Sequence, residues 1–137
     1  MTESPTLVLA FDFGLRQIGV AVGQALTGTA SPLETLRARD GAPDWVAVRT
    51  LVDTWRPERL LVGLPLNMDD TESAMSARAR AFAERLGRTT NTPVELVDER
   101  LSSREAAARS SRGSPRDAAS HATAAAVIAE TWLSERG

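Results

Sequence analysis

The strongest constraint on the fold is a pair of adjacent apolar runs near the N-terminus that enclose one acid. Residues 6–23 read TLVLAFDFGLRQIGVAVG, and Asp12 ends the first run. Such runs predict two strands, and Gly14 and Gly19 suit a tight turn that joins them as an antiparallel hairpin. A carboxylate among apolar neighbours is costly to desolvate unless it is paired, hydrogen-bonded or bound to a cation. Asp12 is therefore the leading functional candidate; the alternative is an acid that only caps the turn.

The rest of the chain alternates between strand and helix patterns. Further strands are expected near residues 28–36, 60–64 and 94–97, and helices near 45–55, 75–86 and 118–133. Thr71 and Gly87 are the expected caps of the second helix, and Ser114 with Pro115 marks the expected start of the third. This order predicts a single α/β domain over residues 1–137, with a five-stranded mixed sheet flanked by helices.

Composition excludes several classes of protein. The chain has no cysteine, so disulfides and thiolate metal sites are excluded. No segment approaches the roughly 20 apolar residues that span a membrane, and the N-terminus lacks a signal-peptide pattern, so a cytoplasmic protein is the default expectation.

The distribution of charge points to a polyanionic partner. All 16 basic residues are arginine, although the net charge is −2. A cluster opposed only by Glu105 comprises Arg100, Arg104, Arg109, Arg112 and Arg116. Backbone phosphates of a nucleic acid are the natural partner of such a cluster. The alternative is a solvated loop whose charge is incidental.

Acids also stand at the end of the last expected strand, where Asp98 and Glu99 follow Val97. Hydrolysis of a phosphodiester needs an activated water and charge stabilisation at two oxygens, which two divalent ions roughly 3.5 to 4 Å apart can supply. Carboxylates from separate elements must then converge. Strand alternation puts Asp98 and Glu99 on opposite faces, so only one of them can easily share the pocket of Asp12.

Four segments in order resemble the YqgF/RuvX family: DFGLRQIGVAVG, LLVGLPLNMDDTES, VELVDERLSSREA and AAAVIAETWL. The resemblance covers nearly the whole chain. It implies a ribonuclease H-like fold, a Holliday-junction-resolvase-like nuclease, and a link to maturation of the 5′ end of pre-16S ribosomal RNA. It also implies that Glu99 is a metal ligand and that Asp98 is structural; a surface acid paired with a nearby arginine is the alternative for Glu99.

The terminal helix departs from the family pattern. His121 stands where relatives usually carry a third aspartate, and Asp117 lies one turn earlier on the same helix face. Either or both could complete the metal site, and imidazole would favour Mn²⁺ over Mg²⁺. The alternatives are that Asp117 only caps the helix with Ser114 and that His121 is a hydrogen-bonded core residue.

Two further departures concern contacts with substrate. Asp70 stands where relatives usually have glycine, and Gln17 stands where they have a basic residue. Arg16, immediately before Gln17, remains a candidate phosphate contact.

The sequence thus predicts an Mn²⁺- or Mg²⁺-dependent nuclease with Asp12, Glu99, Asp117 and His121 at its metal site. Structured or single-stranded RNA, in particular pre-16S ribosomal RNA, is the expected substrate. One alternative is a resolvase of branched DNA, which a homodimer would favour because a four-way junction needs two symmetric cuts. Another is a non-catalytic RNA-binding factor. An ATP-binding sugar kinase or actin-like protein fits less well, because those folds need two such domains.

Overall fold

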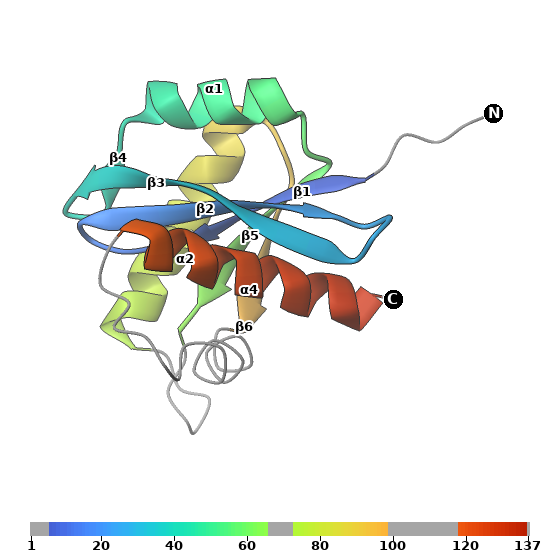
Figure 1. The fold of residues 1–137 in the computed structure, drawn as a ribbon. Coiled ribbons are helices and arrows are strands. Elements are labelled where there is room, and N and C mark those ends of the chain that lie inside the picture. Colours follow the sequence, from blue (N-terminus) through green and yellow to red (C-terminus); the bar gives the residue numbers. More distant parts are fainter. Residues whose placement is uncertain (1–5, 66–72, 99–117, 137) are drawn as a thin grey trace.

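The computed structural model describes residues 6–65, 73–98 and 118–136. Its elements follow the expected order of a strand hairpin and then alternating helices and strands (Figure 1). They are β1 (Leu7–Asp12), β2 (Gln17–Gln24), β3 (Thr29–Arg39), β4 (Ala42–Pro43), α1 (Trp45–Trp55), β5 (Arg59–Leu64), α2 (Ala74–Thr90), β6 (Val94–Asp98) and α4 (Ala118–Arg136). None of the helices in these ranges is long and apolar enough to cross a membrane.

The strands form one mixed sheet in the order β4-β3-β2-β1-β5-β6. Strands β1 to β4 pair with antiparallel neighbours, whereas β5 runs parallel to β1 and β6 runs parallel to β5. The prediction of five strands misses β4, whose two residues pair with Ala38 and Arg39 at the edge of the sheet. A strand of this length is too short to produce an alternating pattern in the sequence.

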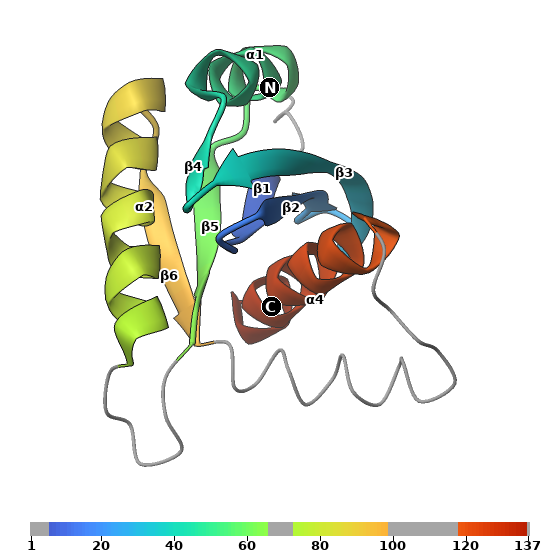
Figure 2. The same ribbon diagram turned by 90° about the vertical axis from the view of Figure 1, so that its left-hand side faces the viewer.

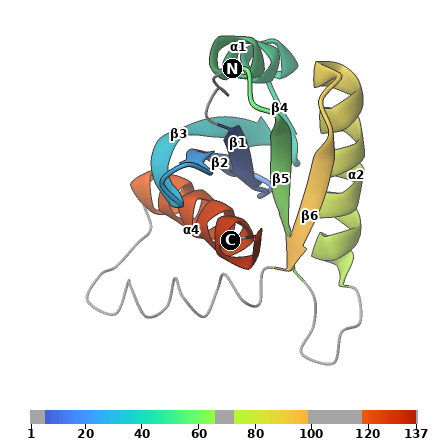
Figure 3. The same ribbon diagram turned by 90° about the vertical axis from the view of Figure 1, so that its right-hand side faces the viewer.

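The two faces of the sheet carry different layers of helix. Along β1, Leu9 and Phe11 pack into the cluster that includes α1 and α2, whereas Val8 and Ala10 pack against α4. Figures 2 and 3 show α2 and α4 on opposite sides of the sheet. The parallel strands β1, β5 and β6 therefore end at one common edge, between the two helical layers.

The helix ends differ in part from the sequence-based expectation. The side chain of Ser73 caps the start of α2 by accepting from the backbone N–H of Ser76, while the expected cap Thr71 lies outside the described residues. The expected C-cap at Gly87 is wrong, because α2 continues to Thr90 and ends at Asn91, whose φ of 55° is left-handed. A Cβ at Gly87 would lie 3.3 Å from Val94 Cγ2, so this glycine serves close packing and not termination.

The terminal helix also runs further than its apolar pattern predicts. The described part of α4 extends beyond residue 133 to Arg136. Its predicted start at Ser114 lies outside the described residues.

Candidate functional site

Asp12 is the last residue of β1 and is partly buried. It pairs across the sheet with Gly19 of β2. Its neighbours Phe11 and Phe13 both belong to the cluster on the α2 face. Because strand side chains alternate between faces, the carboxylate of Asp12 is directed to the α4 face.

The turn beside Asp12 is tightly built. A Cβ at Gly14 would collide with the carbonyl oxygen of Gln17, so only glycine fits this path. The backbone N–H of Ala38 donates to the carbonyl of Arg16 at 2.8 Å, and the N–H of Gly41 donates to the carbonyl of Leu15 at 2.9 Å. Strand β3 and its turn thus fix the backbone of Arg16, while its side chain stays exposed next to the strand end that carries Asp12.

The first described turns of α4 pack directly on the strand next to Asp12. A Cβ at Gly19 would collide with the carbonyl group of His121 and would lie 2.8 Å from the backbone nitrogen of Ala122. His121 itself is partly buried. The helix backbone at His121 therefore lies against the residue that pairs with Asp12, on the sheet face to which Asp12 is directed.

This close approach of α4 to β2 was not predicted from the sequence. The sequence predicts that Gly14 and Gly19 frame the turn, and Gly19 lies within β2, as expected for a second strand over residues 18–22. The available signal was a glycine inside a strand combined with an alanine-rich helix, since that combination marks a close approach of two backbones.

The end of β6 reaches the same edge of the sheet. Gly63 pairs with Val97, and Leu64 pairs with Asp98. Two inter-strand spacings separate β6 from β1, which corresponds to about 10 Å. Side chains that follow the two strands on the same face are therefore close enough to share a pair of ions roughly 3.5 to 4 Å apart.

Alternation along β6 agrees with the sequence-based expectation. Val97 is buried in the cluster against α4, and Leu96 packs on the α2 face. Asp98 lies two residues after Leu96 on the strand, so its side chain faces the same side as Leu96 and is directed away from the face of Asp12. Alternation predicts that Glu99, two residues after Val97, faces the other side, but Glu99 lies outside the described residues.

Most of the remaining site predictions also fall on residues that are not described. These are Asp117 and the cluster Arg100, Arg104, Arg109, Arg112 and Arg116, as well as Asp70. Within residues 6–65, 73–98 and 118–136, no three Asp, Glu, His or Cys side chains gather closely enough to hold a metal ion. Of the four predicted metal ligands, the described part of the chain brings together Asp12 and the α4 turn at His121.

Comparison with known proteins identifies relatives over almost the full length. A family model for RuvX, described as "Holliday junction resolvase", matches residues 6–135. A protein of Marinobacter nauticus is 52% identical over 133 residues, which is 94% of this chain and 93% of the relative. One of Azotobacter vinelandii is 52% identical over 138 residues, with 98% and 97% covered. Both relatives carry the name "Putative pre-16S rRNA nuclease".

Solved structures of low sequence identity share the fold. RuvC of Thermus thermophilus, solved in complex with a Holliday junction substrate, has a TM-score of 0.62 at 18% identity, with 96% of this chain and 95% of that chain covered. The fowlpox virus resolvase, solved with Holliday junction DNA, has a TM-score of 0.52 at 8% identity, with 96% and 99% covered. These matches confirm the predicted ribonuclease H-like fold, and the sequence matches show that the chain belongs to the RuvX family.

Proposed function

We propose that this chain is a divalent-metal-dependent nuclease that processes the 5′ end of pre-16S ribosomal RNA. The observation that carries the proposal is the position of Asp12 at the edge where β1, β5 and β6 end, directed to the α4 face on which the helix backbone at His121 packs against Gly19. The names of the relatives supply the reaction class and the substrate. Bacterial ribosomal RNA is transcribed in the cytoplasm, so the proposal implies that compartment.

The donor groups that we propose for this edge would suit a divalent cation. The carboxylate of Asp12 supplies the hard oxygen that both Mg²⁺ and Mn²⁺ accept, while the imidazole of His121 is a better ligand for Mn²⁺. Glu99 and Asp117 would add further carboxylates. When bound, a pair of such ions activates a water and stabilises charge on the attacking and leaving oxygens.

The remaining residues in this proposal bind and orient the RNA. Arg16, fixed through its backbone to β3, would contact a phosphate next to the scissile one. The cluster Arg100, Arg104, Arg109, Arg112 and Arg116 would contact phosphates further along the strand. Contacts of this kind recognise charge and backbone shape and give little specificity for base sequence.

A resolvase of branched DNA is the second candidate function. The description of the matching family model and the fold shared with RuvC favour it. It uses the same hydrolytic chemistry at the same residues and requires two copies of the site in a symmetric dimer. Substrate preference and oligomeric state together separate this candidate from the RNA nuclease.

The test is a cleavage assay with the full chain on labelled pre-16S RNA 5′ ends, single-stranded RNA and four-way DNA junctions, with Mn²⁺, Mg²⁺ or a chelator. We expect metal-dependent cleavage of RNA that is lost in Asp12→Asn, a change that keeps the size of the side chain and removes its charge. The matched control is Asp53→Asn on the exposed surface of α1, which should cleave like the wild type.

A binding measurement separates loss of catalysis from loss of folding. Calorimetric titration with Mn²⁺ should give weaker binding in Asp12→Asn than in Asp53→Asn, while both variants keep the wild-type circular dichroism spectrum. Preferred cleavage of junctions by a dimer would support the resolvase instead. RNA binding without cleavage by the wild type would support a non-catalytic RNA-binding factor and contradict the proposal.

A further inference from the structure

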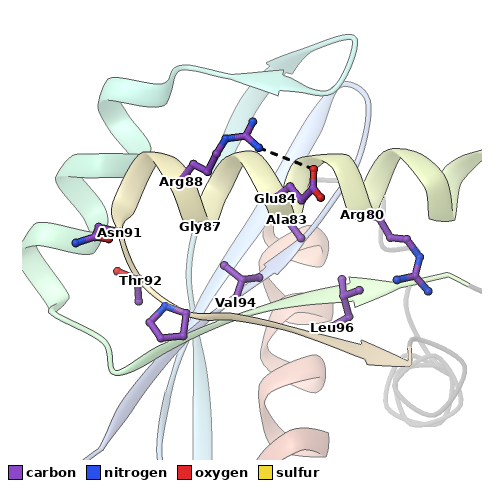
Figure 4. Close-up of a pocket in the computed structure, with 10 residues that line it drawn as sticks. Arg80, Ala83, Glu84, Gly87, Arg88, Asn91, Thr92, Val94 and Leu96 are labelled. Carbon is purple, nitrogen blue, oxygen red and sulfur yellow. Dashed lines mark ion pairs between the residues drawn. The ribbon is translucent and has the colours of Figure 1, made fainter.

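An open groove of about 640 Å³ lies between α2 and β6 (Figure 4). Its apolar lining includes Ala83 from α2 and Val94 and Leu96 from β6. The groove is on the α2 face of the sheet, opposite to the face to which Asp12 is directed. It is therefore separate from the proposed metal site, and the inference drawn from it is independent of the proposed function.

The groove runs along a sheet edge with outward-directed backbone groups. Strand β6 is the last strand of the sheet, and its partner in the described structure is β5. The carbonyl of Pro93 accepts from the N–H of Leu60 at 2.8 Å, so this carbonyl faces β5. Because these directions alternate along a strand, the N–H and C=O groups of Val94 and Leu96 face away from the sheet. Such an edge can pair with an additional strand.

Charged side chains follow the groove on its helical side. Arg80, Glu84 and Arg88 are spaced by four residues, so they form one stripe along α2, and all three line the groove. Arg88 and Glu84 are 71% and 80% exposed, with Nη1 and Oε1 3.9 Å apart. The two arginines at the ends of the stripe are separated by about 12 Å along the helix axis.

We propose that the groove binds an extended acidic segment of a partner protein as an additional strand beside β6. Alternate side chains of that segment would face α2. Two acids four positions apart span about 13 Å in a strand, which matches the separation of Arg80 and Arg88. A small apolar residue midway between them would lie over the apolar lining near Ala83. The preferred segment is therefore acid-x-apolar-x-acid, and its symmetry suits either strand direction.

A second copy of this chain fits the groove less well. Antiparallel pairing of two β6 edges about a two-fold axis would oppose Glu84 to Glu84 and Arg80 to Arg88, which places like charges together. A nucleic acid strand also fits less well, because Glu84 stands at the centre of the stripe and Ala83, Val94 and Leu96 make part of the lining apolar.

The test uses the full chain and two fluorescein-labelled peptides of equal composition. One has the core Thr-Glu-Thr-Val-Thr-Glu-Thr, and the other has one glutamate moved by a single position so that the two acids face opposite ways. Fluorescence anisotropy at low salt should show saturable binding of the first peptide. The second should bind at least about fivefold more weakly, since it loses an ion pair and its register.

Variants of the stripe provide the second measurement. Arg80→Glu combined with Arg88→Glu should weaken binding of the first peptide by about tenfold. The matched control Arg49→Glu, on the exposed surface of α1, should leave binding unchanged. Glu84→Gln should tighten binding by about twofold to fivefold, because it removes both a repulsion and a competitor for Arg88. A gain of binding cannot result from misfolding.

Several outcomes would overturn the inference. Equal binding of the two peptides, or equal loss in Arg49→Glu, would show that the contact is nonspecific. Displacement of the peptide by single-stranded RNA would assign the groove to a polyanion. Concentration-dependent dimers in sedimentation that disappear in the double arginine variant would assign it to a second copy of the chain.

Discussion

Replacement of Gly19 by alanine should separate the two elements that form the candidate metal site. Gly19 pairs with Asp12 on one side, and the α4 backbone at His121 and Ala122 lies against it on the α4 face. The added Cβ would lie 2.8 Å from the nitrogen of Ala122, whereas ordinary contacts begin at 3.4 Å. The obstructing atoms belong to the helix backbone, so no rotation of a side chain relieves the collision.

The expected losses of stability and cleavage rate follow from this distance. The helix must retreat by about 0.6 Å at Ala122 and further at the carbonyl of His121. Overpacking of this kind costs about 1–3 kcal/mol of unfolding free energy, and each kcal/mol lowers the Tm of a domain of this size by about 3 °C. A misplacement of 1 Å at a catalytic site costs about 100-fold in rate, so we expect a loss of about tenfold or more in cleavage.

The assay pairs urea unfolding with single-turnover cleavage, and Gly23→Ala is the control. Gly23 lies on the same strand and face, but its added Cβ would meet side-chain atoms of Val8, Leu133 and Ala129 at 3.1, 3.2 and 3.3 Å. The side chains of Val8 and Leu133 can shift, and Ala129 and Leu133 lie toward the other end of α4. Gly23→Ala should therefore lose some stability and keep its cleavage rate. A folded Gly19→Ala variant with the wild-type rate would refute the reasoning.

Four further predictions follow from the same structure and sequence. His121→Asp should shift the preference in cleavage from Mn²⁺ toward Mg²⁺, measured as the ratio of rates with the two ions. Glu95→Gln should cost about 1–2 kcal/mol in urea unfolding, because Glu95 Oε2 accepts from Trp132 Nε1 at 2.9 Å and Oε1 lies 3.3 Å from Arg59 Nη1; the loss should be smaller in a Trp132→Phe background. Phe82→Ala should cost about 3–5 kcal/mol, because Phe82 packs against three other aromatic rings. Arg109→Gln should lower the slope of log K against log salt for single-stranded RNA by about 0.7, if Arg109 contacts one phosphate.

The strand hairpin and the strand-helix order could be predicted because the apolar residues of each element recur at the spacing that is typical of its secondary structure. The apolar runs that form β1 and β5 have buried positions on both faces, which is the pattern of strands covered by two helical layers. Asp12 could be identified for the same reason, since a carboxylate at the end of such a run departs from the pattern. The opposite directions of Leu96 and Val97 follow from alternation alone, and the structure agrees.

Other features depend on distant contacts and leave little local signal. Strand β4 is formed by only two residue pairs with β3. Gly87 resembles a helix terminator in sequence, yet its role is to let α2 approach Val94, while Asn91 provides the left-handed cap. The contact of Gly19 with His121 joins residues that are far apart in the chain, so a glycine within a strand and an alanine-rich helix indicate a close approach without identifying the residues that meet.

The difference between the two faces of the sheet explains why the candidate site is on the α4 side. Large side chains such as Phe11 and Leu60 keep α1 and α2 at a distance, whereas the α4 layer is rich in alanine and packs on Gly19 and Gly23. The sheet also curves around α4 (Figure 2). The register between β2 and β3 shifts between Val20 and Ala21, where Leu33 of β3 is passed over, and such bulges increase the local twist of a sheet. A helix that is enclosed on several sides must be apolar on several faces, as the stretch from residue 122 to residue 133 is. Small residues thus allow the α4 backbone at His121 and Ala122 to lie directly against Gly19, the residue that pairs with Asp12.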